Sequence, residues 1–275
     1  MPYIEVDGLP LMVDKIGKGP AVVLLHGFAS EGRPCRPLVW TLDREFATIS
    51  LDLVGHNTSG SPIALTRYEM PRVVDDLVAL IHTLGFERAA WVGHGLGGNI
   101  ALQVAVRHPE ATWAIALEAA SPGIEDAEAR TRQRTEDEAL ASRLETNGLS
   151  AFVDEWEALP IWESQRRVLS PQQLEALHIE RLSQRAKGLA NVVRGMGLGA
   201  QEWVGDRLPQ VTIPALLLAG SLDTAACDAA RGMAASLPNA TVTILEGAGH
   251  TAHLEQPEAF NEAVLAFLRE AVARD

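Results

Sequence analysis

The stretch Ala89-Ala90-Trp91-Val92-Gly93-His94-Gly95-Leu96-Gly97-Gly98 decides the fold of this chain. Its first part is continuously apolar, which is typical of a strand that is buried on both faces of a sheet. Its glycines allow a sharp turn, and the apolar residues from Ile100 to Val106 then follow helical spacing. The segment therefore predicts a buried strand that turns abruptly into a helix.

The alternation of strand and helix continues on both sides of this segment. Residues 4–6 and 11–16, separated by Asp7-Gly8, predict an opening hairpin. Further strands are predicted at short apolar runs, which are Ala21–Leu25, Ala47–Leu53, Ala114–Leu117, Ala215–Ala219 and Thr241–Leu245. Helical spacing between the runs predicts an α/β protein with a mostly parallel sheet that helices cover on both faces.

Residues 123–207 differ in character from the segments on either side. Strand-like runs disappear there, and charged, helix-prone residues prevail, as in Glu125–Leu144 and Gln172–Arg185. We therefore expect a helical cap inserted into the sheet domain. The expected division is a first core part at 1–122, the cap at 123–207 and a second core part at 208–275.

Composition limits the classes of partner. The chain has 275 residues, of which 47% are hydrophobic, and a formal net charge of −13 that is spread along the sequence. This charge argues against binding to nucleic acid or to an anionic membrane, and leaves a small-molecule substrate as the expected partner. The sequence suggests a monomer or a homodimer without deciding between them.

The cysteines and the lengths of the apolar runs are those expected of a cytoplasmic protein. Cys35 and Cys227 are far apart and form no CxxC or metal-ligand spacing, as expected for a reduced protein. No apolar run approaches the ~20 residues of a membrane helix, and residues 1–5 do not resemble the start of a signal peptide. We expect a cytoplasmic protein that uses no metal or cofactor, since the histidines show no HExxH-like spacing.

Four positions fall after predicted strands, where an open α/β sheet gathers its functional groups. They are His26-Gly27-Phe28, the turn Gly93–Gly98, Asp223 and His250. The order of glycine turn, acid and histidine is that of the α/β-hydrolase triad, in which the turn has the form G-x-S-x-G. Here the middle residue is Gly95, which has no side chain to act as a nucleophile. A dinucleotide-binding turn fits less well, because it is expected early in the fold.

These features resemble the α/β-hydrolase superfamily and, within it, the MenH-like branch. MenH enzymes form 2-succinyl-6-hydroxy-2,4-cyclohexadiene-1-carboxylate with elimination of pyruvate. The resemblance covers nearly the whole chain, including the expected cap. The segments that carry it are Leu25–Phe28, Leu117–Gly123, Phe152–Gln165, Gly188–Gln201 and Gly247–Pro257.

The resemblance implies a role for each residue at the strand ends. His250 would be the catalytic acid or base, and Asp223 would hold its imidazole in one tautomer. The backbone N–H groups of Phe28 and Leu96 would form an oxyanion hole, which does not depend on a side chain at Gly95.

Other positions are expected to contact the substrate or to be structural. Substrate contacts are predicted for Ser30, His94, Asn99, Trp156 and Arg181. His26, His56 and His253 are expected to have structural roles. A replacement nucleophile is not expected, because the candidates Ser30, Ser121, Cys35 and Cys227 do not lie on the strained turn.

The departures from the family pattern are concentrated where its chemistry lies. Gly95 replaces the serine, and Asn99 and Ala225 stand where basic residues are expected, with Gln133 near another such place. Because the family's basic groups hold substrate carboxylates by charge-assisted hydrogen bonds, a dicarboxylate substrate is disfavoured.

Four functions remain open on the sequence. The first is an enzyme without a nucleophile, in which His250, Asp223 and the oxyanion hole catalyse a lyase, isomerase or cyclase reaction. The second is a MenH-type lyase, or a hydrolase of C–C or ester bonds, whose serine at position 95 has been substituted. The third is a pocket remodelled in the laboratory, and the fourth is a non-catalytic protein that binds a small molecule.

Overall fold

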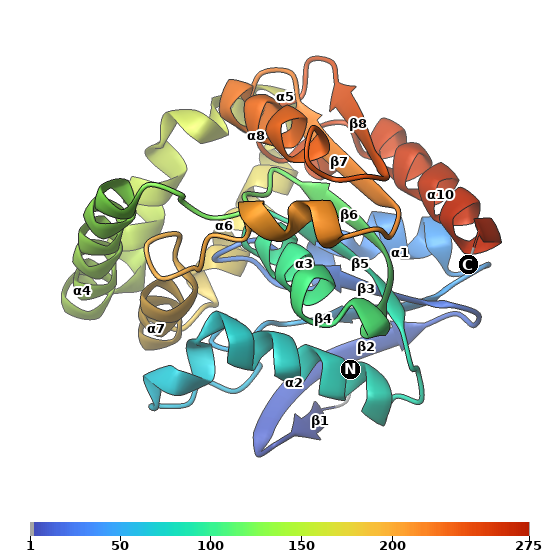
Figure 1. Cartoon of the computed structure of the whole chain (residues 1–275). Coiled ribbons are helices and arrows are strands. Elements are labelled where there is room, and N and C mark those ends of the chain that lie inside the picture. Colours follow the sequence, from blue (N-terminus) through green and yellow to red (C-terminus); the bar gives the residue numbers. More distant parts are fainter. Residues whose placement is uncertain (1–2, 275) are drawn as a thin grey trace.

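The computed structural model describes residues 3–274, whose centre is an eight-stranded sheet (Figure 1). Its order is β1-β2-β4-β3-β5-β6-β7-β8. The strands are β1 (Tyr3–Val6), β2 (Leu9–Ile16), β3 (Ala21–Leu25), β4 (Ala47–Leu51), β5 (Ala89–His94), β6 (Thr112–Glu118), β7 (Ala215–Gly220) and β8 (Ala240–Leu245). From β4 to β8 all neighbours are parallel, whereas β1 and β2 pair antiparallel, so the predicted α/β class and the opening hairpin are confirmed.

Alternation of side chains along the strands creates two apolar cores, one on each face of the sheet. Val23 and Leu25 of β3 belong to one core, while Val22 and Leu24 belong to the other. The first core is covered mainly by α2 (Met70–Thr83) and α3 (Leu96–Arg107), and the second by α1 (Arg36–Leu42) and α10 (Pro257–Arg274). Strands covered on both faces must be apolar throughout, which explains the continuous runs in the sequence.

Between β6 and β7 the chain forms helices and, within the described residues, no strand. These are α4 (Ala127–Ala158), α5 (Glu163–Val168), α6 (Pro171–Leu182) and α7 (Ala186–Met196). They lie together beyond the edge of the sheet at which α3 begins (Figure 1), and α4 is kinked at Gly148, where φ is 81°. We refer to residues 123–207 as the helical insertion.

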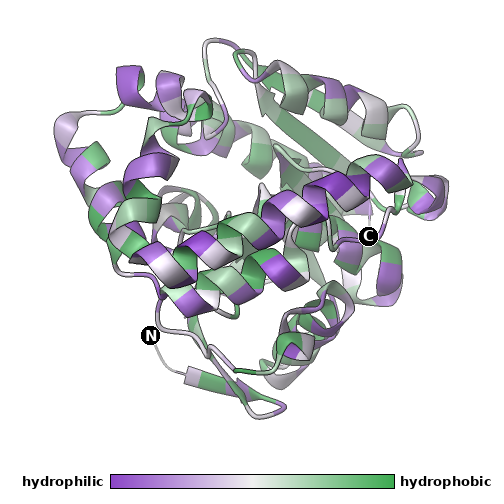
Figure 2. Ribbon diagram, turned by 90° about the vertical axis from the view of Figure 1, so that its left-hand side faces the viewer, coloured by the Kyte–Doolittle hydropathy of each residue, from purple (hydrophilic) through white to green (hydrophobic). Residues whose placement is uncertain are grey.

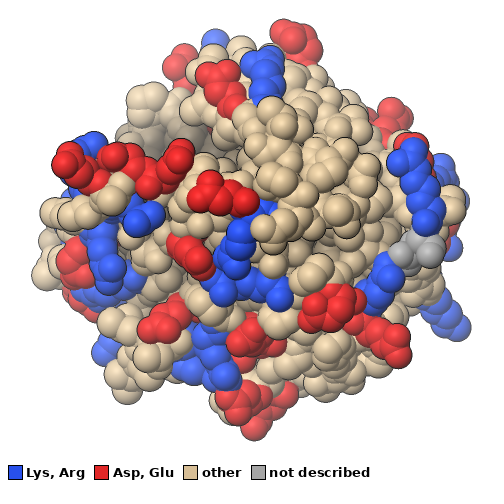
Figure 3. Space-filling view, in the orientation of Figure 1, with Lys and Arg blue, Asp and Glu red and all other residues tan. Residues whose placement is uncertain are grey.

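The surface carries charges of both signs. Figure 2 shows hydrophilic and hydrophobic residues interspersed along the outer helices, as expected for helices that cover a core on one side. On the face shown in Figure 3, Lys and Arg lie among Asp and Glu, so the acidic excess is not gathered in one patch there. Of the helices within residues 3–274, none combines the length and the apolar character needed to cross a membrane.

Candidate active site

The turn between β5 and α3 has the shape of a nucleophile elbow. Gly95 has φ 52° and ψ −115°, a conformation that L-residues rarely adopt. A Cβ on Gly93 would collide with the carbonyl oxygen of Gly97, and a Cβ on Gly97 would collide with that of Leu25. The two flanking glycines are therefore required by packing. A Cβ on Gly95 would meet nothing within 4 Å, so a side chain at this position would point into open space.

His250 and Asp223 form a hydrogen-bonded pair at the same edge of the sheet. His250 Nδ1 donates to Asp223 Oδ2 over 2.7 Å, while Asp223 Oδ1 accepts from the N–H of Ala226 at 3.0 Å and so caps α8 (Thr224–Ala234). Burial raises the pKa of Asp223, but the bonds from His250 and Ala226 outweigh it and the net pKa is lowered. An ionised Asp223 thus fixes the imidazole with its proton on Nδ1, which leaves Nε2 as an acceptor.

Gly95 and His250 line one cavity of about 340 Å³. Phe28 and Leu96 line it as well, and Leu96 is the first residue of α3, where N–H groups have no acceptor within the helix. A row of aromatic rings leads to His250, and of these Phe28 and Trp156 line the cavity. Ring centroids are 5.5 Å apart between Phe28 and Trp156, 5.6 Å between Trp156 and Trp162, and 5.4 Å between Trp162 and His250. The cavity therefore offers a base, candidate backbone donors and an apolar surface together.

The described residues that line this cavity, which we name the elbow cavity, include no Lys or Arg. Its one carboxylate, Asp137, accepts from Gln133 Nε2 and from the N–H of Gly199, each at 2.9 Å. Apolar side chains make up much of the remaining lining; they are Leu140, Val192, Val193, Met196 and Leu198. A ligand with several carboxylates would find no cationic partner here.

Two of the predicted substrate contacts line the elbow cavity, and three do not. Trp156 forms part of its wall, and Asn99 lies at its edge, where Oδ1 accepts from the N–H of Ser121 at 2.7 Å. Ser30, His94 and Arg181 are absent from the lining. The contacts predicted for these three residues are therefore not supported by the elbow cavity.

The partners of these side chains explain their positions. The guanidinium of Arg181 donates to Glu157 Oε1 at 2.8 Å, and its side chain is 11% exposed. Ser30 Oγ donates to Glu180 Oε1 at 2.7 Å, which joins the loop after β3 to α6. His94 faces a second, smaller cavity, in which Cys35 also lies.

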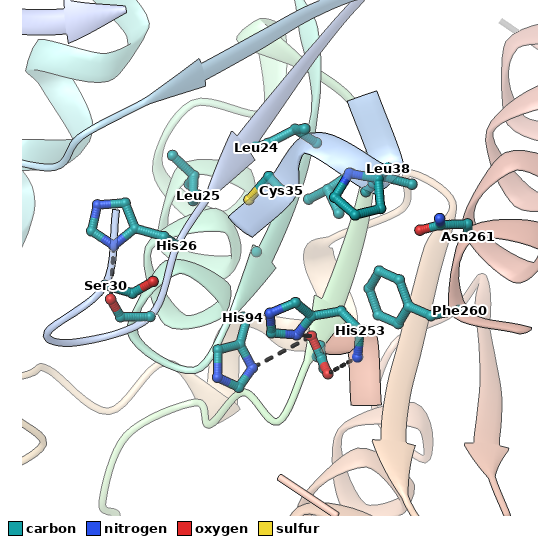
Figure 4. Close-up of a pocket in the computed structure, with 15 residues that line it drawn as sticks. Leu24, Leu25, His26, Ser30, Cys35, Leu38, His94, His253, Phe260 and Asn261 are labelled. Carbon is teal, nitrogen blue, oxygen red and sulfur yellow. Dashed lines mark hydrogen bonds and ion pairs between the residues drawn. The ribbon is translucent and has the colours of Figure 1, made fainter. Parts of the chain in front are cut away.

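Cys35 ends the short helix Arg33–Cys35 and so does not lie on the strained turn, although it is near the elbow in space. It lines the smaller cavity together with Gly93 and His94 (Figure 4). Burial raises the pKa of the Cys35 thiol to about 12, so it is protonated at neutral pH and does not replace the missing nucleophile. Cys227 is held in α8 by donation of its thiol to the carbonyl of Gly220.

Two of the histidines expected to be structural order the loops around β3 and β4. His26 Nε2 accepts from the N–H of Leu53 at 2.9 Å, and His56 Nε2 accepts from the N–H of Ala29 at 3.3 Å. Both rings are buried, and burial lowers the pKa of each. Their hydrogen bonds fix the loop that contains Phe28.

Glu118 is a buried acid to which the sequence reasoning assigned no role. It ends β6 and is 2% exposed, and it accepts from His253 Nδ1 at 2.7 Å. Burial raises its pKa, but His253 and His94 outweigh burial and lower it strongly, so the carboxylate is ionised. Burial lowers the pKa of His94 to about 4, which keeps that ring neutral. An acid directly after the apolar run Ala114–Leu117, at the functional edge of the sheet, is the signal that could have indicated this residue.

Glu180 leads to a prediction of pH-dependent stability. Burial raises the pKa of Glu180 to about 7 from an ordinary value of 4.5, against the lowering effect of the Ser30 hydroxyl. Between these two pH values the folded chain holds a proton that the unfolded chain has lost, so its stability falls as the pH rises from 4.5 towards 7. Glu180→Gln is expected to stabilise the protein by about 1–3 kcal/mol at pH 8 and to change little at pH 4.5.

Urea unfolding at both pH values measures this effect. Glu175→Gln, on the exposed side of the same helix, is the matched control and should leave the difference between the two pH values unchanged. A gain of equal size at both pH values would contradict a titrating Glu180.

Several known proteins are similar to this chain in sequence. Residues 20–257 match a family model described as the alpha/beta hydrolase fold. A candidate 2-succinyl-6-hydroxy-2,4-cyclohexadiene-1-carboxylate synthase of Bacillus subtilis (strain 168) is 32% identical over 252 residues, which cover 90% of each chain. The synthase of that name from Serratia proteamaculans (strain 568) is 27% identical over 250 residues, which cover 90% of this chain and 93% of that one.

A solved structure is similar along almost its whole length. MenH from S. aureus superposes with a TM-score of 0.90 at 27% identity, covering 95% of this chain and 98% of that one. The resemblance therefore includes the helical insertion as well as the sheet.

Proposed function

The chain belongs to the α/β hydrolase family, with synthases of the MenH type among its relatives, and we propose that it is an enzyme of this family that works without a nucleophilic side chain. In this proposal His250 and Asp223 are the acid–base pair, and the N–H groups of Phe28 and Leu96 stabilise negative charge on a substrate oxygen. The observation that carries the proposal is the pair itself, joined at 2.7 Å, of which His250 lines the same cavity as Gly95.

The chemistry follows from the two nitrogens of His250. With the Nδ1 proton held by Asp223, Nε2 takes a proton from the carbon next to a substrate carbonyl. The electron pair of the broken C–H bond forms a carbon–carbon double bond, and the π pair of the carbonyl moves to its oxygen, where the two backbone N–H groups hold the enolate. The protonated His250 then returns its proton to a leaving group or to another carbon. The outcome is elimination or isomerisation, and no acyl-enzyme is formed.

The cavity lining indicates the class of substrate. An uncharged carbonyl compound with an apolar body fits a site of about 340 Å³ whose described lining has one carboxylate and no cation. Each hydroxyl or amide of such a ligand can still pair with the polar edge formed by Asn99, Ser121 and Gln201. The proposed substrate, an uncharged carbonyl compound, therefore differs from one that carries several carboxylates.

Exchange of substrate protons for deuterium tests the proposal without knowledge of the full reaction. Uncharged cyclic and aromatic ketones that fit the cavity are incubated with the protein in D2O, and the α-carbon signal is followed by NMR. The proposal requires exchange above the buffer rate for members of this panel. A folded protein that binds panel members and exchanges none of them would instead support a binding protein.

The carboxylate of Asp137 is predicted to disfavour anionic ligands in the elbow cavity. Asp137→Asn removes a negative charge from the elbow cavity and keeps the shape of the side chain. We expect the affinity for an anionic probe to rise by roughly 30-fold, because a like charge about 8 Å away costs on the order of 2 kcal/mol at an effective dielectric of about 20. The affinity for the matched primary amide should stay within about twofold.

Titration calorimetry with the carboxylate and amide forms of one ketone measures both affinities. Asp154→Asn, on the same helix, is the control for net charge alone. Equal gains in the two variants would show that the cavity does not select by charge.

A second candidate function is favoured by the free space over Gly95. Since a Cβ there meets nothing within 4 Å, the elbow has room for the serine that the family pattern places at this position. The chain would then be a lyase or hydrolase whose serine has been substituted. Restoring the serine separates this candidate from the first.

A further inference from the structure

Beneath the elbow, three side chains from separate elements converge on one buried point. Strands β5 and β6 are paired in register so that His94 stands opposite Glu118 at their ends. His253 reaches the same point from α9 (Ala252–Glu255). Figure 4 shows His94 and His253 close together at one end of the smaller cavity, and their ring centroids are 4.8 Å apart. The first two residues are thus held by the sheet edge, and the third by a helix beside it.

The polar atoms of the three side chains lie close enough together to become ligands of one ion. Glu118 Oε2 lies 2.7 Å from His253 Nδ1 and 3.4 Å from His94 Nδ1, and the three donor atoms all fall within 4.8 Å of one another. Donors at about 2.0–2.2 Å from a tetrahedral zinc ion are themselves roughly 3.3–3.6 Å apart. Small side-chain movements, with loss to solvent of the proton that His253 Nδ1 donates to Glu118, would therefore let all three atoms contact one ion.

An ordinary buried ion pair explains only part of this cluster. Glu118 accepts from both the backbone N–H and Nδ1 of His253, which accounts for those two residues. His94 Nδ1 is left over, since it is fully buried and makes no hydrogen bond although the carboxylate is 3.4 Å away. Buried polar atoms normally have a partner, so this nitrogen points to a missing group. The adjoining cavity, of about 50 Å³, has room for one or two water molecules as further ligands.

We propose that His94 Nδ1, Glu118 and His253 Nδ1 bind one divalent transition-metal ion of the zinc class. Two imidazole nitrogens and one carboxylate suit Zn²⁺, Co²⁺, Fe²⁺ and Ni²⁺ better than Mg²⁺ or Ca²⁺, which prefer oxygen ligands. The site is separate from His250, whose Nδ1 is engaged by Asp223, although the rings of His94 and His250 lie 5.1 Å apart. The proposal does not depend on the reaction assigned to the elbow cavity.

Cobalt binding to the chelator-treated full chain tests the proposal. We expect one Co²⁺ per chain by equilibrium dialysis, with visible absorption bands that Zn²⁺ abolishes at one equivalent. His94→Phe is the decisive variant, because His94 Nδ1 makes no hydrogen bond in the described structure and its nearest polar contact is the carboxylate of Glu118 at 3.4 Å, so its removal should leave the fold intact. Its affinity for Zn²⁺ should fall at least about tenfold, a loss of roughly 1.4 kcal/mol. His253→Gln should weaken binding as well.

Two control variants separate this site from its surroundings. Cys35→Ser alters another residue that lines the smaller cavity, and His250→Gln alters the neighbouring imidazole outside the cluster. Both should bind Zn²⁺ as the unaltered chain does. The proposal is overturned if the folded, unaltered chain binds no Co²⁺ at 100-fold excess over protein, or if His94→Phe binds Zn²⁺ unchanged.

Discussion

His250→Ala is expected to lower the rate of α-proton exchange on an accepted ketone by roughly 10²- to 10⁴-fold, the usual contribution of a positioned general acid–base group. The imidazole is the titratable side chain that joins Asp223 to the elbow cavity. Its removal leaves the oxyanion donors in place, so ligand affinity should change much less than the rate. Deuterium incorporation followed by NMR, with the ligand dissociation constant measured alongside, separates the two effects.

Asp223→Asn provides an independent check on the same pair. An amide at this position can leave the wrong nitrogen of His250 protonated, and in a serine protease such a change lowers kcat by about 10⁴-fold. His178→Ala is the control, because His178 also pairs with a carboxylate, that of Glu157, but away from the elbow. Exchange that survives both His250→Ala and Asp223→Asn would rule out the pair as the acid–base group.

The glycine turn and the strand pattern were predictable because both depend on local sequence. Gly93 is required by its contact with the nearby Gly97, and apolar runs reflect burial on both faces, whereas the contact of Gly97 with Leu25 is a tertiary one. The positions of Asp223 and His250 also follow from the sequence, since strands that run parallel end at one edge. Their bond at 2.7 Å is what that topology leads one to expect.

The hydrogen-bond partners of Ser30 and Arg181 could not be predicted from strand order alone. Ser30 and Arg181 take their partners, Glu180 and Glu157, from helices of the insertion, and the orientation of those helices depends on tertiary packing. The cluster around Glu118 likewise depends on a register between β5 and β6 that brings His94 opposite the acid. Residue types reveal which side chains are available, but packing determines which of them meet.

Gly95→Ser is expected to create ester hydrolysis where the unaltered chain has almost none. The serine Oγ would enter the open space over the elbow, beside His250, with Phe28 and Leu96 lining the same cavity. We expect the rate on an uncharged p-nitrophenyl ester to rise at least about 10²-fold, since loss of the serine from a complete triad costs about 10⁶ in kcat. The positive φ makes the variant less stable by about 1–3 kcal/mol.

Mass spectrometry of the quenched reaction should then show an acyl group on the new serine. Gly95→Ala carries the same backbone strain without the hydroxyl and should gain nothing, and Gly95→Ser combined with His250→Ala should lose the gain. A folded Gly95→Ser protein without an acyl-enzyme would contradict the geometry assigned to the elbow and its histidine. Tested on the substrate of the 2-succinyl-6-hydroxy-2,4-cyclohexadiene-1-carboxylate synthases, the variant decides between the two candidate functions. Strong turnover would favour a substituted serine enzyme, whereas the absence of cations from the described lining leads us to expect none.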